Sequence, residues 1–359
     1  MPYLHPTEWI DKGLSIVGRR TGVIALLFVG TVLLSVVIFI SPSHPKSVYR
    51  FDNNGKTATA SGIVLNFTSD RLYSIQPNVC SQNGRHPHLV LFIPSRPGNT
   101  EDRAAIRETW GMHARLCNVR IVFGFGRIDS TETQHEVYVE NSVYGDLLQV
   151  ADVPDAYRSQ TKLVLAFLEW GAANCPGARF IGKADEDTWI NLHEVMRYLE
   201  MPQAAYSITG HFIINGTVFR KPEEKWYLTV EEYPNDTYPP FPLGQLYVFP
   251  NDLLPSVLSA SQRLSMHWLD DVFIGGQIPA LLRIPHLHIA TRAQLSEAKN
   301  LMKNCTNSGG ANAVRFNCDC VGRDWVIIHE TPAAAKREIF YDPCMKIYRQ
   351  YTCSVLSEQ

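Results

Sequence analysis

From residue 88 onward, the hydrophobic pattern alternates between strand-length and helix-length segments. Four apolar runs have the length of β-strands and lie at 88–95, 119–126, 146–153 and 178–187. The segments between them have helical character and lie at 101–111, 130–143 and 158–173. Strands that alternate with helices predict an α/β fold, in which helices cover both faces of a mixed, mainly parallel sheet.

The most apolar stretch of the chain lies near its beginning, at 21–40, and contains no charged residue. Its length matches the ~20 residues that a helix needs to cross a bilayer. Arg19 and Arg20 precede it directly, and the next charged residue after it is Lys46. This bias predicts a cytosolic tail at 1–20 and a type II orientation. The alternative is a cleaved signal peptide, but its apolar core is usually only ~7–15 residues long, so we expect an uncleaved signal anchor.

The composition beyond this stretch is typical of a chain outside the cytosol. Residues 41–84 are rich in Ser, Asn, Thr and Gly and predict a lumenal stem, which leaves 85–359 as the lumenal domain. All eight cysteines lie beyond the anchor, and an even number favours disulfides, although the C-x-C at 318–320 leaves zinc as a weaker alternative. The N-x-S/T sequons that predict a glycoprotein lie at Asn66, Asn215, Asn235 and Asn304.

A short acidic run, GKADEDTWIN, ends the last predicted strand of the series. It places Asp185, Glu186 and Asp187 side by side. A solvated turn is the simpler interpretation, and a divalent-metal site is the alternative. Because ligands of parallel α/β sheets bind at the carboxyl ends of strands, the position favours the metal site. A net charge of −2 gives no sign of a nucleic-acid binder.

Two further groups of charged residues match the needs of a metal-dependent nucleotide-sugar transferase. Such an enzyme requires carboxylates for a hard cation, cationic groups for phosphates, and a carboxylate base for the acceptor hydroxyl. Arg103 and Arg107 are one helical turn apart just past the first predicted strand. WLDDVFIGG offers Asp270 and Asp271 as a second acidic pair, for which the alternative is helix capping by Asp270.

Five blocks in order along 85–330 resemble glycosyltransferase family 31, the β1,3-galactosyltransferase and β1,3-N-acetylglucosaminyltransferase group. The blocks are RAAIRETWG at 103–111, D-x-Y at 155–157 with a later tryptophan and C-P, KADEDTWIN at 183–191, YPPFPLG at 238–244 and DDVFIG at 270–275. A late histidine, His329 in WVIIHE, is also matched. One departure is Leu163, which stands where the family often has lysine, with Lys162 one place away.

The resemblance implies a GT-A, Rossmann-like fold and a role for each matched residue. Asp187 with Asp185 would hold Mn²⁺ (or Mg²⁺) on UDP, with Glu186 near the ribose and His329 as a further ligand or a structural histidine. The residues expected to line the nucleotide pocket are Arg103, Arg107 and Lys183. Asp271 would be the catalytic base, with Asp270 as the alternative.

The implied function is that of an inverting, manganese-dependent β1,3-galactosyltransferase. It would move galactose from UDP-galactose to the 3-hydroxyl of an acceptor sugar on a glycolipid or glycoprotein, in the Golgi membrane with the catalytic domain lumenal. The alternatives are transfer of N-acetylglucosamine or N-acetylgalactosamine from another UDP-hexose by the same mechanism, and a catalytically inactive Golgi carbohydrate-binding relative.

Overall fold

The computed structural model describes residues 50–51, 57–58, 64–65, 71–80, 86–289, 292–294 and 327–341. The stretch 21–40, for which the sequence predicts a signal anchor, lies outside these residues, as does the tail at 1–20. Among the described residues no helix has the length and apolar character needed to cross a membrane. In the predicted stem, three short strands form a small antiparallel sheet: β1 (Arg50–Phe51), β2 (Thr57–Ala58) and β3 (Val64–Leu65).

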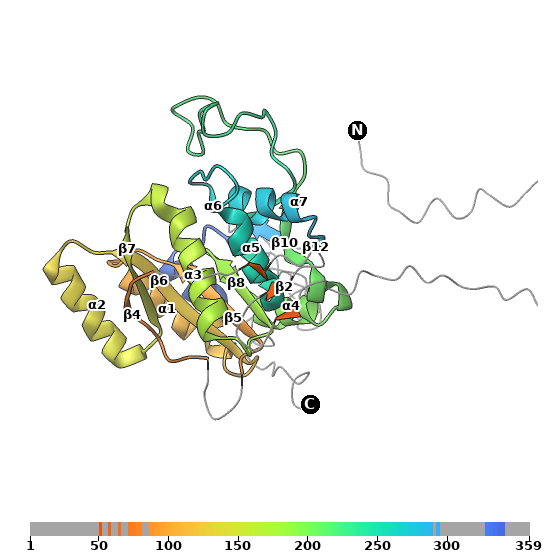
Figure 1. The fold of residues 1–359 in the computed structure, drawn as a ribbon. Helices are drawn as coiled ribbons and strands as arrows, with labels where there is room; N and C mark the ends of the chain where they lie inside the picture. Colours follow the sequence, from red (N-terminus) through yellow and green to blue (C-terminus); the bar gives the residue numbers. More distant parts are fainter. Residues whose placement is uncertain are drawn as a thin grey trace, which may run out of the picture. The chain divides into compact units, whose positions relative to one another are not determined.

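An eight-stranded mixed sheet forms the centre of the domain (Figure 1). In spatial order its strands are β12 (His286–His288), β10 (Ile208–Ile213), β11 (Phe241–Pro250), β8 (Phe180–Ala184), β5 (Leu89–Pro94), β6 (Val119–Arg127), β7 (Leu147–Pro154) and β4 (Tyr73–Ile75). Strands β8, β5, β6 and β7 are parallel to one another, whereas β11 and β4 run antiparallel to their neighbours. The four strands predicted from the hydrophobic runs are these four parallel strands, which confirms the mixed α/β sheet.

Helices cover both faces of this sheet, as the pattern predicts. One face packs against α1 (Thr100–Glu108), α2 (Thr131–Tyr144), α4 (Leu192–Leu199) and α10 (Ala333–Tyr341). The other packs against α3 (Gln160–Asn174), α5 (Leu254–Ser261) and α7 (Ile278–Leu282). Strand β5 shows the alternation that this requires, because Leu89 and Leu91 lie in the first core and Val90 and Phe92 in the second.

Several short elements complete the domain. A second sheet contains β13 (Arg292–Gln294), β14 (Ile327–His329) and β9 (Trp189–Ile190). The single-turn helices are η2 (Trp110–His113), η3 (Tyr157–Ser159), η4 (Pro202–Tyr206), η5 (Asn251–Leu253) and α6 (Asp270–Val272), which continues into the π-helix η6 (Phe273–Gln277). Strand β14 therefore lies beside the strand that follows the acidic run.

A disulfide between Cys80 and Cys175, 95 residues apart, joins the segment after β4 to the end of α3. It agrees with the prediction of disulfides from the even cysteine count. Closing a loop of this length restricts the unfolded chain, and removing such a bond typically costs about 2–5 kcal/mol.

Replacing both half-cystines, as Cys80→Ser with Cys175→Ser, is therefore expected to lower the free energy of unfolding by about 2–5 kcal/mol. Urea denaturation of the double variant and of the unaltered chain, both without reductant, measures the difference. Adding reductant should destabilise the unaltered chain and leave the double variant less affected. Equal midpoints for the two proteins would contradict the stabilising role of this bond.

Candidate active site

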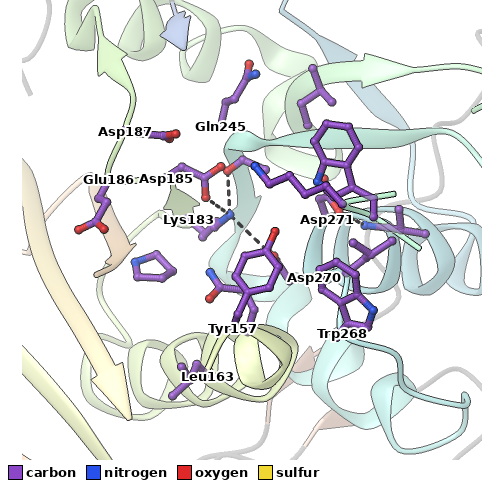
Figure 2. A pocket seen from close by; sticks show the side chains of 18 of the residues that line it. Tyr157, Leu163, Lys183, Asp185, Glu186, Asp187, Gln245, Trp268, Asp270 and Asp271 are labelled. Carbon is purple, nitrogen blue, oxygen red and sulfur yellow. Dashed lines mark hydrogen bonds and ion pairs between the residues drawn. The ribbon is translucent and has the colours of Figure 1, made fainter. Parts of the chain in front are cut away.

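A large cavity opens at the carboxyl ends of β5, β6 and β8, where an α/β sheet is expected to bind ligands (Figure 2). Its volume is about 930 Å³, which is at the upper end of small-molecule sites. Its wall also includes residues of the 214–240 connection between β10 and β11 and of the segment around α6. The cavity is large enough for a small-molecule ligand.

The acidic run lies in the wall of this cavity. Strand β8 is buried along its whole length, and the chain leaves it at Ala184 directly into Asp185, Glu186 and Asp187, which all line the cavity. Figure 2 shows Asp185 and Asp187 on the same side of the pocket, above Glu186. The run is therefore part of a concave site and not only a solvated turn.

Asp185, Asp187 and His329 form a group that could hold a metal ion. One ligand atom from each lies within 4.8 Å of the others, and His329 Nε2 is 3.6 Å from Asp187 Oδ1. Thr331 holds this arrangement in place, because its backbone N–H and its hydroxyl both donate to the Asp187 carbonyl, at 2.7 and 2.9 Å. Two carboxylates and one imidazole suit a divalent cation such as Mn²⁺.

Lys183 is the cation at the centre of the site. Its side chain is buried, and its ammonium group lies 2.5 Å from Asp185 Oδ1 and 3.4 Å from Asp270 Oδ2. It also donates to the Gly244 carbonyl at 2.9 Å. Burial alone would lower the pKa of Lys183, but the two carboxylates outweigh it and raise the pKa, so the amine stays charged. Lys183 therefore links the acidic run to the second acidic pair.

Replacing this cation is expected to destabilise the protein. In Lys183→Met the carboxylates of Asp185 and Asp270 lose their buried partner, and breaking a buried ion pair in this way typically costs about 3–5 kcal/mol. Thermal and urea denaturation of the full chain measure the loss. Lys162→Met, an exposed lysine on α3, is the matched control and should unfold like the unaltered chain. A Lys183→Met protein of normal stability would contradict the role of the ion pair.

The second acidic pair begins a helix that is drawn close to the sheet. Asp270 is the first residue of α6, but Leu269 occupies the N-cap position and makes no side-chain capping hydrogen bond, so the alternative of helix capping by Asp270 is wrong. The π-helix η6, which continues α6, approaches β11 closely at Gly275. A Cβ at Gly275 would lie 2.5 Å from Pro242 Cγ on β11, so a larger residue would prevent this approach. The two aspartates differ in their partners. Asp270 Oδ2 accepts a hydrogen bond from Tyr247 Oη at 2.8 Å and faces Lys183, whereas Asp271 Oδ1 accepts the Val272 backbone N–H at 2.8 Å.

Gly244 marks the point where the two acidic groups meet. A Cβ at this position would lie 3.2 Å from Asp185 Oδ2, 3.7 Å from Asp271 Oδ2 and 3.1 Å from Lys183 Nζ. The carboxylate of the acidic run and the carboxylate of the second pair therefore face one another across a single backbone position. Figure 2 shows Asp185 and Asp271 lining the same pocket.

The environment of Asp271 prepares it to accept a proton near neutral pH. Burial raises the pKa of Asp271 to about 7, and the neighbouring Asp270 carboxylate adds to this effect. Burial also raises the pKa of Asp270, whereas Lys183 opposes the rise. Asp270 is held by Tyr247 and Lys183, so Asp271 is the better placed of the two to accept a proton from a bound hydroxyl group.

Glu186 occupies the side of the cavity near β5. Its Oε1 accepts a hydrogen bond from Asn99 Nδ2 at 2.5 Å. Burial raises its pKa, and hydrogen bonding to Ser95 and Asn99 opposes the rise. Both partners belong to the loop between β5 and α1, so Glu186 connects the acidic run to that loop.

Arg103 and Arg107, which were expected to line the nucleotide pocket, lie elsewhere in the structure. Arg103 is fully buried and donates to both carboxylate oxygens of Glu140, and also to the carbonyls of Arg96 and Pro97. Arg107 pairs with Glu140 and with Asp146, each at 2.8 Å. Neither is among the described residues that line the cavity, because these contacts turn both guanidinium groups toward α2 and the start of β7. Arg103 braces the loop after β5 through Ser95 and the carbonyls of Arg96 and Pro97.

Several lining residues were given no role from the sequence. Arg96 and Asn99 come from the loop braced by Arg103, and Gln245 follows Gly244 on β11. Their position at the carboxyl end of β5 could have indicated the first two. Leu163 also lines the cavity, as Figure 2 shows, while Lys162 points to solvent. The substitution therefore places an apolar side chain in the wall.

Two of the four predicted glycosylation sites lie in the described residues. Asn215 and Asn235 are both exposed on the 214–240 connection, and the threonines of their sequons, Thr217 and Thr237, pair in an antiparallel bridge. Asn66 and Asn304 lie outside the described residues. The exposed positions are accessible to modification, and glycosylation itself stays a prediction.

Comparison with known proteins identifies relatives over most of this domain. Residues 101–290 match the family model described as galactosyltransferase. The chain is 33% identical over 206 residues to beta-1,3-galactosyltransferase 5 of Pan troglodytes, a match that covers 56% of this chain and 69% of that protein. It is also 32% identical over 282 residues to lactosylceramide 1,3-N-acetyl-beta-D-glucosaminyltransferase of Rattus norvegicus, which covers 69% of this chain and 71% of that protein.

Proposed function

Because the chain belongs to the galactosyltransferase family and is a hexosyltransferase, we propose that it is an inverting, Mn²⁺-dependent β1,3-galactosyltransferase. Its donor is UDP-galactose, and its acceptor is the 3-hydroxyl of a sugar on a glycolipid or glycoprotein. Its catalytic centre is the part of the cavity that surrounds Gly244.

One observation carries this proposal: Asp185 and Asp271 face one another across Gly244 in one cavity. A transferase that uses a nucleotide sugar must hold the diphosphate on one side of the anomeric carbon and a base on the other. The group of Asp185, Asp187 and His329 supplies the first, and Asp271 supplies the second. A solvated acidic turn would not face a second carboxylate in this way.

The proposed reaction is a single displacement. Asp271 accepts the proton of the acceptor 3-hydroxyl as that oxygen forms a bond to the anomeric carbon, and the bond from that carbon to the phosphate oxygen breaks, so that UDP leaves with the electron pair. A divalent ion held by Asp185, Asp187 and His329 would stabilise the negative charge of UDP. Attack from the face opposite the leaving group converts an α-linked donor into a β-linked product.

Lys183 and Glu186 have supporting roles in this mechanism. Lys183 keeps Asp185 and Asp270 in fixed positions through its buried contacts. Glu186 lies beside the loop after β5, where the nucleoside half of the donor would bind. Arg96, which lines the cavity in that loop, supplies positive charge there in place of Arg103 and Arg107.

Transfer of N-acetylglucosamine is the second candidate function. It is favoured by the similarity to the lactosylceramide enzyme, which extends over a larger share of this chain than the match to the galactosyltransferase. Transfer of N-acetylgalactosamine would use the same residues. Asp271 acts on the acceptor 3-hydroxyl, and the group of Asp185, Asp187 and His329 acts on the diphosphate, which is common to these donors.

A donor panel with the full chain in detergent tests the proposal. UDP-galactose, UDP-N-acetylglucosamine, UDP-N-acetylgalactosamine and UDP-glucose are each offered with galactose- and N-acetylglucosamine-terminated acceptors, with Mn²⁺, with Mg²⁺ or with chelator. We expect β1,3-linked galactose product that requires Mn²⁺. Product from UDP-N-acetylglucosamine alone would establish the second candidate. No product with any pair, together with retained UDP binding, would indicate an inactive carbohydrate-binding relative.

We also propose that the enzyme is a single-pass type II protein of the Golgi membrane with its domain in the lumen. The apolar stretch at 21–40 and the exposed sequons at Asn215 and Asn235 support this placement. Protease protection of intact microsomes, followed by deglycosylation and a mass-shift assay, tests the topology. Full digestion of the domain without detergent would contradict it.

A further inference from the structure

The cavity extends beyond the reaction centre along the connection between β10 and β11. This connection, 214–240, contains isolated bridges instead of strands. It contributes six described residues to the cavity wall: Gly216, Thr217, Phe219, Lys225, Trp226 and Tyr238. None of them is used by the proposed displacement, so this wall is free to bind a different part of the substrates.

Two buried polar atoms in this region have no hydrogen-bond partner among the described residues. They are Tyr238 Oη and Trp268 Nε1, and both side chains line the cavity. A buried donor without a partner costs about 1–3 kcal/mol, so such atoms indicate that a ligand or water completes them. Both lie near Asp271: Trp268 precedes it by three residues and is drawn close to it in Figure 2, and the Asp271 charge adds to the burial that raises the pKa of Tyr238 to about 12.

Farther out, the wall carries two exposed aromatic rings. Trp226 is 46% exposed and Phe219 is 38% exposed, and their ring centroids are 5.5 Å apart. Large exposed aromatic side chains in the wall of a substrate cavity supply flat apolar surface for a ligand. The apolar C–H face of a pyranose ring is a ligand of that kind, and its hydroxyl groups stay in water at the rim.

The wall is held in one conformation by Arg220. Its guanidinium group donates four hydrogen bonds of 2.7–3.0 Å to backbone carbonyls of the segment that follows Trp226, namely those of Leu228, Thr229, Tyr233 and Asn235. Arg158 adds an ion pair to Glu232 at 3.3 Å, and its guanidinium lies 5.2 Å from the Trp268 ring centroid. A loop fixed in this way is preorganised to bind a ligand.

We propose that this wall recognises the acceptor as a disaccharide. Tyr238 Oη and Trp268 Nε1 hydrogen bond the terminal sugar, whose 3-hydroxyl reaches Asp271, and Trp226 with Phe219 stacks on the second sugar. This inference rests on the proposed function, because it assigns the substrate of the same site. It makes the reducing-side sugar, which does not react, a determinant of acceptor choice.

Saturation-transfer NMR with the full chain in detergent, in the presence of UDP and the diamagnetic ion Mg²⁺, tests the assignment without requiring turnover. The probes are methyl β-lactoside and methyl β-chitobioside, each compared with the methyl glycoside of its terminal sugar, and octyl β-galactoside. We expect a disaccharide to bind at least about tenfold more tightly than its monosaccharide. In Trp226→Ala that advantage should fall about tenfold and the monosaccharide affinity should stay unchanged.

Three further variants sharpen the test. Trp226→Phe should restore most of the advantage, and Tyr238→Phe should weaken both classes of probe by a similar factor. Tyr138→Ala, an exposed aromatic on α2, is the matched control and should change nothing. Calorimetric binding of UDP with Mn²⁺ should be equal in all these proteins, since the variants leave the donor side intact.

The outcomes separate the two proposals. If the unaltered chain does not bind UDP or does not transfer sugar, the proposed function fails, and this result is distinct from the outcomes that test the disaccharide assignment. Equal binding of monosaccharides and disaccharides by the unaltered chain would overturn the disaccharide assignment. Octyl β-galactoside binding as tightly as the disaccharides, with the same loss in Trp226→Ala, would also overturn it, because the outer rings would then bind an apolar aglycone.

Discussion

Asp271→Asn is expected to abolish sugar transfer while leaving the protein folded and able to bind UDP. The amide keeps the shape of the side chain but cannot accept the proton of the acceptor hydroxyl. Removing a positioned general base typically lowers the rate by a factor of about 10²–10⁴. Initial rates with saturating donor and acceptor, compared with the unaltered chain, measure the loss.

The control for this variant is its stability, for which the sign follows from the pKa. Folding raises the pKa of Asp271 from 3.8 to about 7, so the folded state binds the proton more tightly and ionisation opposes folding. At pH 8 the neutral amide removes that cost, and Asp271→Asn should be at least as stable as the unaltered chain. Near-normal turnover by a folded Asp271→Asn protein would refute the assignment of the base.

The same pKa predicts the pH dependence of the reaction. Because Asp271 must be ionised to accept a proton, kcat/KM should rise with pH through about 7 and level off above it. Asp270→Asn removes the neighbouring negative charge and should move this midpoint to lower pH. A profile that is flat between pH 5 and pH 8 would show that another group acts as the base.

Asp187→Ala is expected to remove metal-dependent binding of UDP. Asp187 supplies one of the three ligand atoms that lie within 4.8 Å of one another. Loss of residues that only support a metal ligand already costs about 10–100-fold in affinity, so loss of a ligand should cost at least as much. Isothermal titration of UDP with and without Mn²⁺ measures the effect directly, and activity should fall in parallel.

Asp129→Ala provides the matched control, because Asp129 is an aspartate whose side chain is 85% exposed after β6, at a distance from the cavity wall. It should bind Mn²⁺ and UDP like the unaltered chain. His329→Ala should give an intermediate result if the imidazole is a third ligand. Unchanged Mn²⁺-dependent affinity in Asp187→Ala would count against the whole metal group.

The sheet and the acidic run could be predicted from the sequence because both depend on local patterns. The four apolar runs are buried on both sides, so each has the composition of a parallel strand. The carboxyl end of β8 is then the place where Asp185 and Asp187 must emerge. Neither inference requires knowledge of the contacts between residues that are far apart in the sequence.

Arg103 and Arg107 show where local patterns fail. Their spacing placed them on one turn of α1, which was right, and the resemblance then assigned them to the nucleotide. Their partners are Glu140 and Asp146, which lie over 30 residues farther along the chain and become neighbours only when α2 packs beside α1. Spacing alone gave no sign of that packing.

The wall at 214–240 was missed for a related reason. It has no regular secondary structure, so neither hydrophobic period applies to it. Arg220 determines its shape through backbone carbonyls, and any residue can supply a carbonyl, which leaves no trace in the side-chain pattern. The sequence shows that Trp226 and Tyr238 are aromatic, but it does not show that they line the same cavity.

The position of Gly244 affects the reacting groups, whereas other residues of the cavity wall can determine which sugar is bound. The gap between Asp185 and Asp271 is set by main-chain atoms, and even a methyl group there would crowd Lys183. We therefore expect its width to be the same whichever hexose is bound. A relative could exchange one sugar for another by altering Leu163 or Gln245 in the wall and keep the reacting atoms where they are.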